Sequence, residues 1–155
     1  MLKELHISNY VLIDDLQLHP ANDINIITGE TGAGKSIMLG AISLLTGTRA
    51  DKKTLLNDSK KCFVEGTFQK FNIAVLHVLD NHDIDHEEEL IIRREIAPSG
   101  KSRAFVNDTP VRLEVLKELA PLLLDVHSQH QTLLLKNPLF QLDIVDGFAN
   151  TKEEL

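Results

Sequence analysis

The sequence predicts an α/β fold, and three observations carry this prediction. Segments in which apolar and polar residues alternate recur along the chain, as in strands with one buried face. Segments with apolar residues at helical spacing lie between them. A glycine-rich stretch at residues 29–34 joins one strand-like segment to one helix-like segment. The chain has 155 residues, which suits a single domain with a core of its own.

The first part of the chain is predicted to contain three extended segments and a buried helix. Residues 5–18 are typical of two extended stretches, and residues 20–23 carry a turn signal. Residues 24–28 alternate and are rich in isoleucine, so we expect a strand there. Residues 35–45 are apolar on most helical faces, which predicts a buried helix.

The middle of the chain is predicted to contain one strand and one helix. Residues 47–59 are polar and indicate a loop. Residues 62–69 alternate as a strand does, and residues 72–80 have helical spacing. Residues 82–89 are acidic and are expected to be exposed.

The last part is predicted to contain a hairpin, two helices and a buried strand. Residues 90–96 and 103–107 flank a Pro-Ser-Gly turn, which favours a hairpin. Residues 111–119 have helical spacing, and residues 122–127 are a short apolar run that suits a strand buried on both faces. Residues 138–148 begin with proline, as many helices do.

The composition argues against a broad basic surface that grips nucleic acid, because the net charge is −7 and the pI is about 5.4. No apolar run reaches the roughly 18 residues that span a bilayer, so a cytoplasmic protein is expected. The single cysteine, Cys62, has no partner for an internal disulfide and is expected to be buried or half-buried. Four basic clusters are each interpreted as solvated surface: Lys52-Lys53, Lys60-Lys61, Arg93-Arg94 and residues 101–103.

The glycine-rich stretch matches the phosphate-binding motif G-x-x-x-x-G-K-[ST], the P-loop, at every fixed position. A strand-like segment precedes it and an apolar helix follows, which is the context that the motif requires. The alternative interpretation is a glycine-rich turn that merely caps a helix. The residues that we assign to nucleotide binding are Thr28, Gly29, Glu30, Thr31, Gly32, Ala33, Gly34, Lys35 and Ser36.

Each residue type in this motif has a chemical reason. Glycines adopt backbone angles closed to other residues, so several N–H groups can point at phosphate oxygens. The N-terminus of the following helix adds a partial positive charge. Lys35 supplies an ammonium group between the β- and γ-phosphates, and the Ser36 hydroxyl is placed to ligate Mg²⁺. The motif therefore predicts a site for ATP with Mg²⁺.

Four stretches, in the same order along the chain, resemble the SMC-like ATPases of the ABC class. The likeness is greatest to a bacterial member that acts in DNA double-strand-break repair and recombination. It covers nearly the whole chain. The four stretches are residues 5–13 with the phosphate loop, residues 47–50, the hairpin at residues 93–107, and residues 124–130, which resemble the Q-loop.

This resemblance implies an ATPase head that a long antiparallel coiled coil splits into two halves. Residues 1–150 would form the N-terminal half, with a mixed core sheet and an antiparallel β portion near residues 1–20 and 62–107. Residues 151–155 would begin the coiled coil. The signature motif and the Walker B residues would lie in the C-terminal half of the head, so the isolated chain is expected to hydrolyse ATP poorly or not at all.

The same resemblance implies partners for the full-length protein. Two identical heads would sandwich two ATP molecules, and the assembly would hold DNA and associate with the nucleoid when bound to it. No membrane is involved.

The resemblance also gives roles to single residues. Gln129 falls on the Q-loop glutamine, which senses Mg²⁺ and the attacking water, so Lys35 and Gln129 would serve catalysis. Gln131 is the alternative to Gln129. Asn9 and Tyr10 fall where the first strands of such heads approach the base, with simple turn packing as the alternative.

Two other interpretations use residues outside the loop. Asp125 follows three leucines, as a Walker B aspartate does, which would make the chain a complete small P-loop NTPase or kinase. Val126 follows Asp125, however, so the catalytic glutamate of ABC enzymes is absent at that place. The seven histidines could suggest a metal site, but no cysteine pair accompanies them, and we interpret them as surface or packing residues. Arg49 is left with either a surface role or a contact to the nucleotide.

Overall fold

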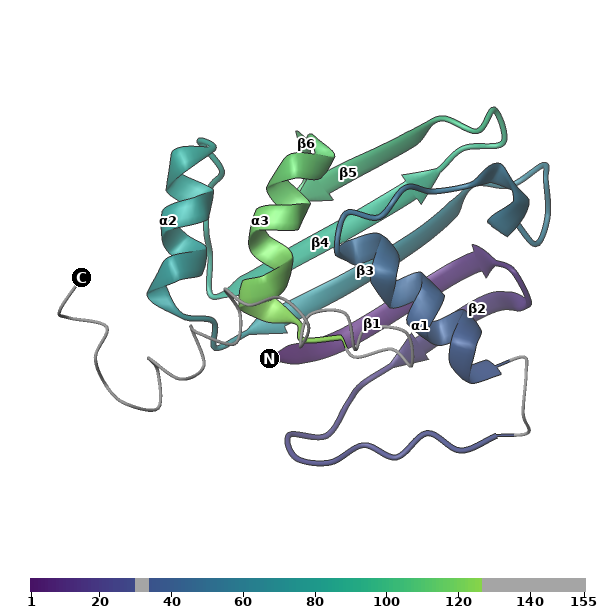
Figure 1. Cartoon of the computed structure of the whole chain (residues 1–155), viewed down its shortest axis with the longest axis horizontal. Helices are drawn as coiled ribbons and strands as arrows, with labels where there is room; N and C mark the ends of the chain where they lie inside the picture. The colour runs from purple at the N-terminus through teal and green to yellow at the C-terminus, as the bar shows by residue number, and fades with distance from the viewer. Residues whose placement is uncertain (30–33, 127–155) are drawn as a thin grey trace, which may run out of the picture. The chain divides into compact units, whose positions relative to one another are not determined.

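A six-stranded antiparallel sheet is the centre of the computed structural model, which describes residues 1–29 and 34–126 (Figure 1). The order of the strands is β2-β1-β3-β4-β5-β6. The strands are β1 (Leu2–Tyr10), β2 (Ile13–Leu18), β3 (Cys62–Gln69), β4 (Glu89–Ile96), β5 (Ser102–Val106) and β6 (Thr109–Val111). The helices are α1 (Gly34–Leu45), the short 3₁₀ helix η1 (Lys52–Thr54), α2 (Ile73–Asn81) and α3 (Leu113–Leu123). All of these elements belong to one compact unit, Met1–Asp125.

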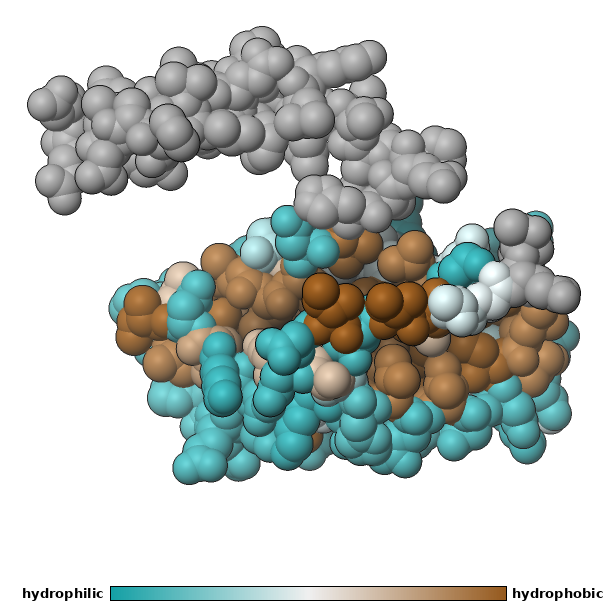
Figure 2. Space-filling model, turned by 90° about the horizontal axis from the view of Figure 1, so that it is seen from below, coloured by the Kyte–Doolittle hydropathy of each residue, from teal (hydrophilic) through white to brown (hydrophobic). Residues whose placement is uncertain are grey.

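One face of the sheet is buried and the other is polar. Every second residue of β3 and β4 is buried, among them Val64, Phe68 and Ile92. This is the period-two pattern of a strand with one covered face. Helices α1, α2 and α3 cover the apolar face (Figure 1). Figure 2 shows a hydrophilic layer along one side of the molecule, with a hydrophobic band next to it.

Two close approaches hold α1 against the sheet. At Gly66 of β3, an added Cβ would lie 2.8 Å from Cδ1 of Leu45 in α1. At Gly40 of α1, an added Cβ would lie 2.9 Å from the hydroxyl oxygen of Tyr10, at the end of β1. The absence of a side chain at both glycines therefore lets the helix lie close to β1 and β3. Because α1 carries the lysine of the phosphate loop, these contacts position the candidate site.

Most of the predicted elements are confirmed. Residues 5–18 fall in β1 and β2, and the predicted hairpin is formed by β4 and β5. Helix α2 begins after Asn72, whose side chain accepts a hydrogen bond from the backbone N–H of Val75 at 3.2 Å. The antiparallel β portion is confirmed, and every strand pair in the described residues is antiparallel.

The strand predicted at residues 24–28 is wrong for this structure. These residues have no regular secondary structure, and Ile24 and Ile26 are 83% and 82% exposed. The isoleucine pattern is that of a strand, but no strand lies beside it in the part of the chain that the structure describes. A strand needs a neighbour to accept and donate its backbone hydrogen bonds.

The strand predicted at residues 122–127 is also wrong over its described residues. Leu122 and Leu123 are the last residues of α3, which continues through Pro121, and residues 124–126 have no regular structure. A short apolar run has no period that separates a strand from a helix. The expectation that α1 is buried on most faces fails as well, since Leu39 is 44% exposed.

Strand β6 was not predicted. It follows Asn107 and Asp108, which have φ angles of 45° and 62° and reverse the chain in a two-residue turn. In the described ranges, no helix is long and apolar enough to cross a membrane. The predicted helix at residues 138–148, the boundary at residue 150 and the coiled-coil start at residues 151–155 lie outside the described residues.

Candidate nucleotide-binding site

The described part of the phosphate loop lies at the open N-terminus of α1. Gly34 is the first residue of the helix, and Lys35 and Ser36 occupy its first turn, where both are exposed. No acidic residue lies in this turn. The first N–H groups of a helix have no acceptor within the helix and carry a partial positive charge. This helix end therefore presents N–H groups, an ammonium group and a hydroxyl to an anion.

Lys35 turns back toward the strand-like segment that precedes the loop. Its Nζ atom donates a hydrogen bond to the carbonyl oxygen of Gly29 at 2.5 Å. Gly29 and Gly34 both face open space, since an added Cβ would meet no atom within 4 Å at either residue. The ammonium group is thus held at the mouth of the loop. A phosphate that enters can replace this carbonyl as the acceptor of the ammonium group, and both partners of the hydrogen bond are then charged.

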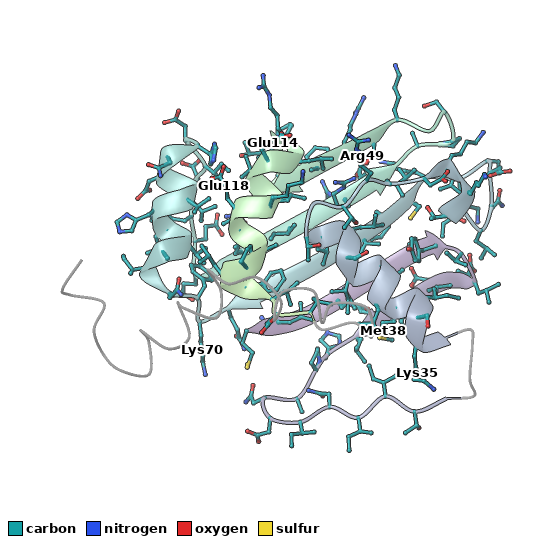
Figure 3. All side chains as sticks on the ribbon, in the orientation of Figure 1. Lys35, Met38, Arg49, Lys70, Glu114 and Glu118 are labelled. Atoms are coloured by element: carbon teal, nitrogen blue, oxygen red, sulfur yellow. The ribbon has the colours of Figure 1, made fainter. Side chains whose placement is uncertain are left out.

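A hollow of about 280 Å³ opens beside Lys35, which Figure 3 places at the start of α1 together with Met38. Its walls are mainly apolar side chains from the β1–β2 hairpin and from α1. A mostly apolar hollow beside a phosphate site has the lining that a flat nucleoside ring requires. The lining residues are Leu12, Ile13, Leu16, Ile27, Thr28, Gly29, Gly34, Lys35, Ile37 and Met38.

The residues present fit a magnesium ion that is shared with phosphate oxygens. Mg²⁺ takes oxygen ligands and usually keeps few contacts to the protein itself. Ser36 offers an exposed hydroxyl oxygen at the helix N-terminus, one residue after the phosphate-binding lysine. Gln129, the second predicted ligand, lies outside the described residues, as do Glu30, Thr31, Gly32 and Ala33 of the loop.

Asn9 and Tyr10, the candidates for base contacts, serve the fold. Asn9 is 3% exposed, and its Nδ2 donates to the carbonyl oxygens of Asn57 and Lys60, both at 3.0 Å. Its Oδ1 accepts from the N–H of Asn57 at 2.7 Å. Tyr10 is buried against α1, and this burial raises the pKa of its hydroxyl. The turn-packing alternative therefore accounts for both residues.

The arginine-rich hairpin divides its two neighbouring arginines between the faces of the sheet. Arg93 lies on the polar face, over the Phe105 ring at 5.0 Å, and pairs with Glu65 at 3.5 Å and with Asp108 at 3.2 Å. Arg94 points into the core and is 1% exposed. Strand alternation forces this division, so the sequence neighbours cannot act on one ligand.

The remaining candidate residues belong to other segments than the phosphate loop or lie outside the described ranges. Asp125 follows the end of α3 and is exposed, so the strand that precedes a Walker B aspartate is absent before it. Arg49 is exposed in the segment after α1. Within the ranges that the structure describes, no group of three or more His, Cys, Asp or Glu residues could hold a metal ion. His127, His130 and Gln131 are not among the described residues.

The sequence does not predict the apolar hollow. For Leu12 and Leu16 the sequence pattern predicts only extended segments, because alternation indicates which face a side chain occupies but not what lies opposite it. Leu12 is 66% exposed, which the alternation alone did not indicate.

A family model described as "AAA domain" matches residues 4–140 of the chain. This chain belongs to the AAA domain family. Its AAA domain is 40% identical over 156 residues to the DNA repair protein RecN of Bacillus subtilis, and 38% identical over 150 residues to that of Vibrio cholerae. These matches cover 99% and 96% of the chain but 27% of each relative. The chain thus spans about a quarter of the length of the curated relatives it matches.

Solved structures show that the AAA domain has the fold of an SMC-type head. A structure concerned with ATP-driven dimerization and DNA-stimulated activation of SMC ATPases matches with a TM-score of 0.63 at 20% identity, over 94% of this chain and 97% of that one. The recombination mediator protein RecF with ATP matches with a TM-score of 0.62 at 20% identity, over 94% of this chain and 36% of that one. The predicted fold class is confirmed by these likenesses.

Proposed function

We propose that this chain is the ATP- and Mg²⁺-binding half of an SMC-like ATPase head that acts in DNA double-strand-break repair and recombination. The observation that carries the proposal is the open N-terminus of α1, where Lys35 and Ser36 are the last two residues of a complete phosphate-loop motif. The relatives named as DNA repair proteins support the biological role.

Catalysis in such a site consists mainly of positioning and charge neutralisation at the γ-phosphate. Bound Mg²⁺ would neutralise charge on the phosphate oxygens. Lys35 would bind the β- and γ-phosphates, and Ser36 would hold the metal. Gln129 would orient the attacking water through its carboxamide. The group that polarises this water would come from the remainder of the protein, because the described residues place no glutamate beside Lys35 or Ser36.

The exposed apolar surface next to the phosphate loop supports the proposal that another part of the protein packs there and completes the head. Ile24 and Ile26 are almost fully exposed. Figure 2, which views the molecule from below, shows a hydrophobic band on this side. An extended segment with unpaired backbone groups is a template for another strand. The relatives are almost four times as long as this chain. We infer that the C-terminal half of the same head adds a strand beside residues 24–28.

The proposal extends to two heads joined through ATP. One structural neighbour is named for ATP-driven dimerization and DNA-stimulated activation. A homodimer with ATP between its heads, acting on DNA in the cytoplasm and at the nucleoid, is the assembly we propose for the full-length protein. The chain alone would then bind Mg-ATP but turn it over slowly or not at all.

Equilibrium binding of a fluorescent ATP analogue with Mg²⁺ tests the site. Replacing Lys35 with Ala removes charge-assisted hydrogen bonds worth about 1.5–3 kcal/mol, so affinity should fall by roughly ten- to hundredfold. Lys70→Ala removes an exposed lysine far from the loop and should leave the affinity unchanged. Equal binding by the Lys35→Ala protein and the unchanged chain would contradict the proposal.

ATP turnover separates this proposal from a complete small NTPase. We expect turnover to appear when the C-terminal half is added to the chain, and Gln129→Ala to slow it with little loss of Mg-ATP affinity. Magnesium-dependent turnover by the chain alone, abolished in Asp125→Asn, would instead favour the complete enzyme.

A further inference from the structure

Basic side chains that are far apart in the sequence gather at one end of the sheet. At this end β3 begins, β4 ends and β5 begins, because Cys62 pairs with Ile96 and Ile96 pairs with Ser102. Lys60 and Lys61 directly precede β3, and Lys61 pairs with Glu95 at 3.2 Å. We call seven other exposed basic residues of this region the basic end: Arg49, Lys52, Lys53, Lys101, Arg103, Arg112 and Lys117.

Two close approaches of the backbone bring these residues together. An added Cβ at Gly100, in the turn between β4 and β5, would lie 3.8 Å from Cβ of Lys52. An added Cβ at Gly47 would lie 2.9 Å from Cγ of Lys117 in α3. The segment after α1 therefore lies against both the hairpin turn and α3. Figure 3 shows Arg49 and Glu114 on the side of the molecule that carries β5 and α3.

A group of acidic residues lies at the other end of the strands. Residues 80–89, between α2 and β4, contribute acids around two surface hollows, and Asp108 joins them from the turn after β5. The net charge of −7 thus averages an acidic end and a basic end. Acidic residues also lie within the basic end, among them Asp51, Glu114 and Glu95, which is opposite Arg103 across β4 and β5 and pairs with Lys61 at 3.2 Å. Asp51 accepts a hydrogen bond from the N–H of Lys53 and caps η1.

A hollow of about 550 Å³ lies within the basic end, between β5 and the start of α3. Arg103 and Arg112 both line it, and neither forms an ion pair or side-chain hydrogen bond with another described residue. Arg112 is also the N-cap of α3, and its side chain makes no capping hydrogen bond. In the first turn of α3 the N–H of Val115 donates to the carbonyl oxygen of Arg112 at 3.2 Å, and the acid Glu114 also lines the hollow. The two guanidinium groups are therefore the main attraction for an anion, with the partial positive charge of the helix end beside them.

A buried arginine reaches the wall of this hollow from behind. Arg94 is 1% exposed, and its Nη2 donates to Oγ of Ser102, a lining residue, at 2.7 Å. Its Nε and Nη1 atoms have no hydrogen-bond partner, and no carboxylate in the described part of the chain pairs with it. A buried charge without a counterion is costly. An anion in the hollow would offset part of that cost through Ser102, which Arg94 contacts.

We propose that the basic end binds the backbone of duplex DNA, with one phosphate in the hollow between Arg103 and Arg112. The proposal rests on the proposed function and adds the surface of this chain that meets the DNA. Single-stranded DNA requires aromatic side chains on which bases stack. Phe105 is the aromatic residue of the hollow, and the guanidinium of Arg93 covers its ring. Contacts to phosphates alone make the binding independent of sequence and sensitive to salt.

Fluorescence anisotropy with a labelled duplex, measured over a series of salt concentrations, tests the proposal on the chain itself. In Arg103→Gln/Arg112→Gln we expect about tenfold weaker binding or more. The slope of log K against log salt should fall by about 0.9 for each lost phosphate contact. Both residues are exposed, so the variant should fold as the unchanged chain does.

The matched control is Lys3→Gln/Lys70→Gln, which removes two charges at the far end of the strands, where β1 pairs with Phe68. Its DNA affinity and salt slope should be those of the unchanged chain. The proposal would be overturned if both double variants lost DNA affinity equally, or if neither lost any. Polyglutamate and unlabelled duplex should also be compared as competitors at equal total charge. If polyglutamate displaced the labelled duplex equally well, the surface would be one for an acidic protein, and the proposal would be overturned.

Nucleotide binding separates this surface from the phosphate loop. Arg103→Gln/Arg112→Gln should bind Mg-ATP as tightly as the unchanged chain. Lys35→Ala should lose ATP affinity while it keeps its affinity for the duplex in the absence of nucleotide. Loss of DNA binding in the arginine variant with intact ATP binding therefore supports the surface even if the ATPase role fails.

Discussion

Single residues show how strongly position decides chemistry in this protein. Arg93 and Arg94 are neighbours of one residue type, yet one forms a surface ion-pair network and the other is a buried cation. Burial lowers the pKa of the Arg94 guanidinium, but arginine stays charged at any physiological pH. The difference comes from the alternation of a strand and not from the residues themselves.

Cys62 gives a prediction at the same scale. The thiol is fully buried at the start of β3, and this burial raises its pKa to about 11. At pH 8 the folded thiol should therefore react with iodoacetamide at least about a hundredfold more slowly than the unfolded thiol, because only the thiolate reacts. Alkylation rates with and without urea, followed by mass spectrometry, measure this ratio. Equal rates in the two states would show that Cys62 is open to solvent.

The same thiol gives the stability a pH dependence. Its folded pKa is higher than its ordinary value, so the unfolded chain loses the proton first as the pH rises. The contribution of the thiol is therefore complete below about pH 9 and is lost between about pH 9 and pH 11. Urea midpoints over this range should fall more steeply for the unchanged chain than for Cys62→Ala.

At the scale of elements, one side chain ties the segment before β3 to the end of β1. Asn9 has a φ angle of 56° and makes three hydrogen bonds to residues 57 and 60. Asparagine tolerates this backbone region better than most residues. Asn9→Ala removes all three of these partly buried bonds and should destabilise the fold by about 2–4 kcal/mol.

Urea denaturation followed by circular dichroism measures this loss. Ser8→Ala is the matched control, because its exposed hydroxyl makes one hydrogen bond, at 3.4 Å, and its loss should cost less than about 0.5 kcal/mol. A change at Asn9 no larger than that at Ser8 would show that the segment is held by other contacts.

The elements also show what the sequence could predict. Where an element packs inside the described unit, as β3 and α2 do, the periodicity of its own residues was sufficient to predict its type and place. Residues 24–28 carry the pattern of a strand but have no neighbouring strand among the described residues. Pairing is a property of two segments, whereas the pattern belongs to one. The strand predicted at Leu122 and Leu123 was wrong for another reason. An apolar run of that length suits both a strand and a helix end.

Of the candidate functional residues too, the sequence predicts those in a local motif and not those brought together by the fold. The phosphate-loop motif is local, so Lys35 and Ser36 could be assigned from spacing. The basic end is built from residues 49–53, 101–103 and 112–117, and no local pattern joins these segments. Their charges were therefore interpreted separately as solvated surface, and the overall net charge hid their proximity.

At the scale of the whole molecule, the polarity of the surfaces indicates which side is left for another part of the protein. The outer face of the sheet is polar, whereas the segment before the phosphate loop exposes large isoleucines. A monomeric soluble protein rarely leaves such residues together on its surface. The phosphate site borders this apolar side, since Ile27 lines the hollow beside Lys35. A partner that covers the exposed isoleucines is therefore expected to contribute to the nucleotide site as well.

Replacing Ile24 and Ile26 with Thr tests this expectation, because threonine keeps the branched shape that strands favour and removes apolar surface. Both side chains are exposed, so the free energy of unfolding of the chain should change by less than about 0.5 kcal/mol. Binding to the C-terminal half, measured by calorimetry, should weaken by about 1.5 kcal/mol or more for each isoleucine that becomes buried. Leu56→Thr, which changes an exposed leucine outside this segment, should leave the binding intact. If the double variant bound the C-terminal half as tightly as the unchanged chain, the isoleucines would not be the surface that completes the head.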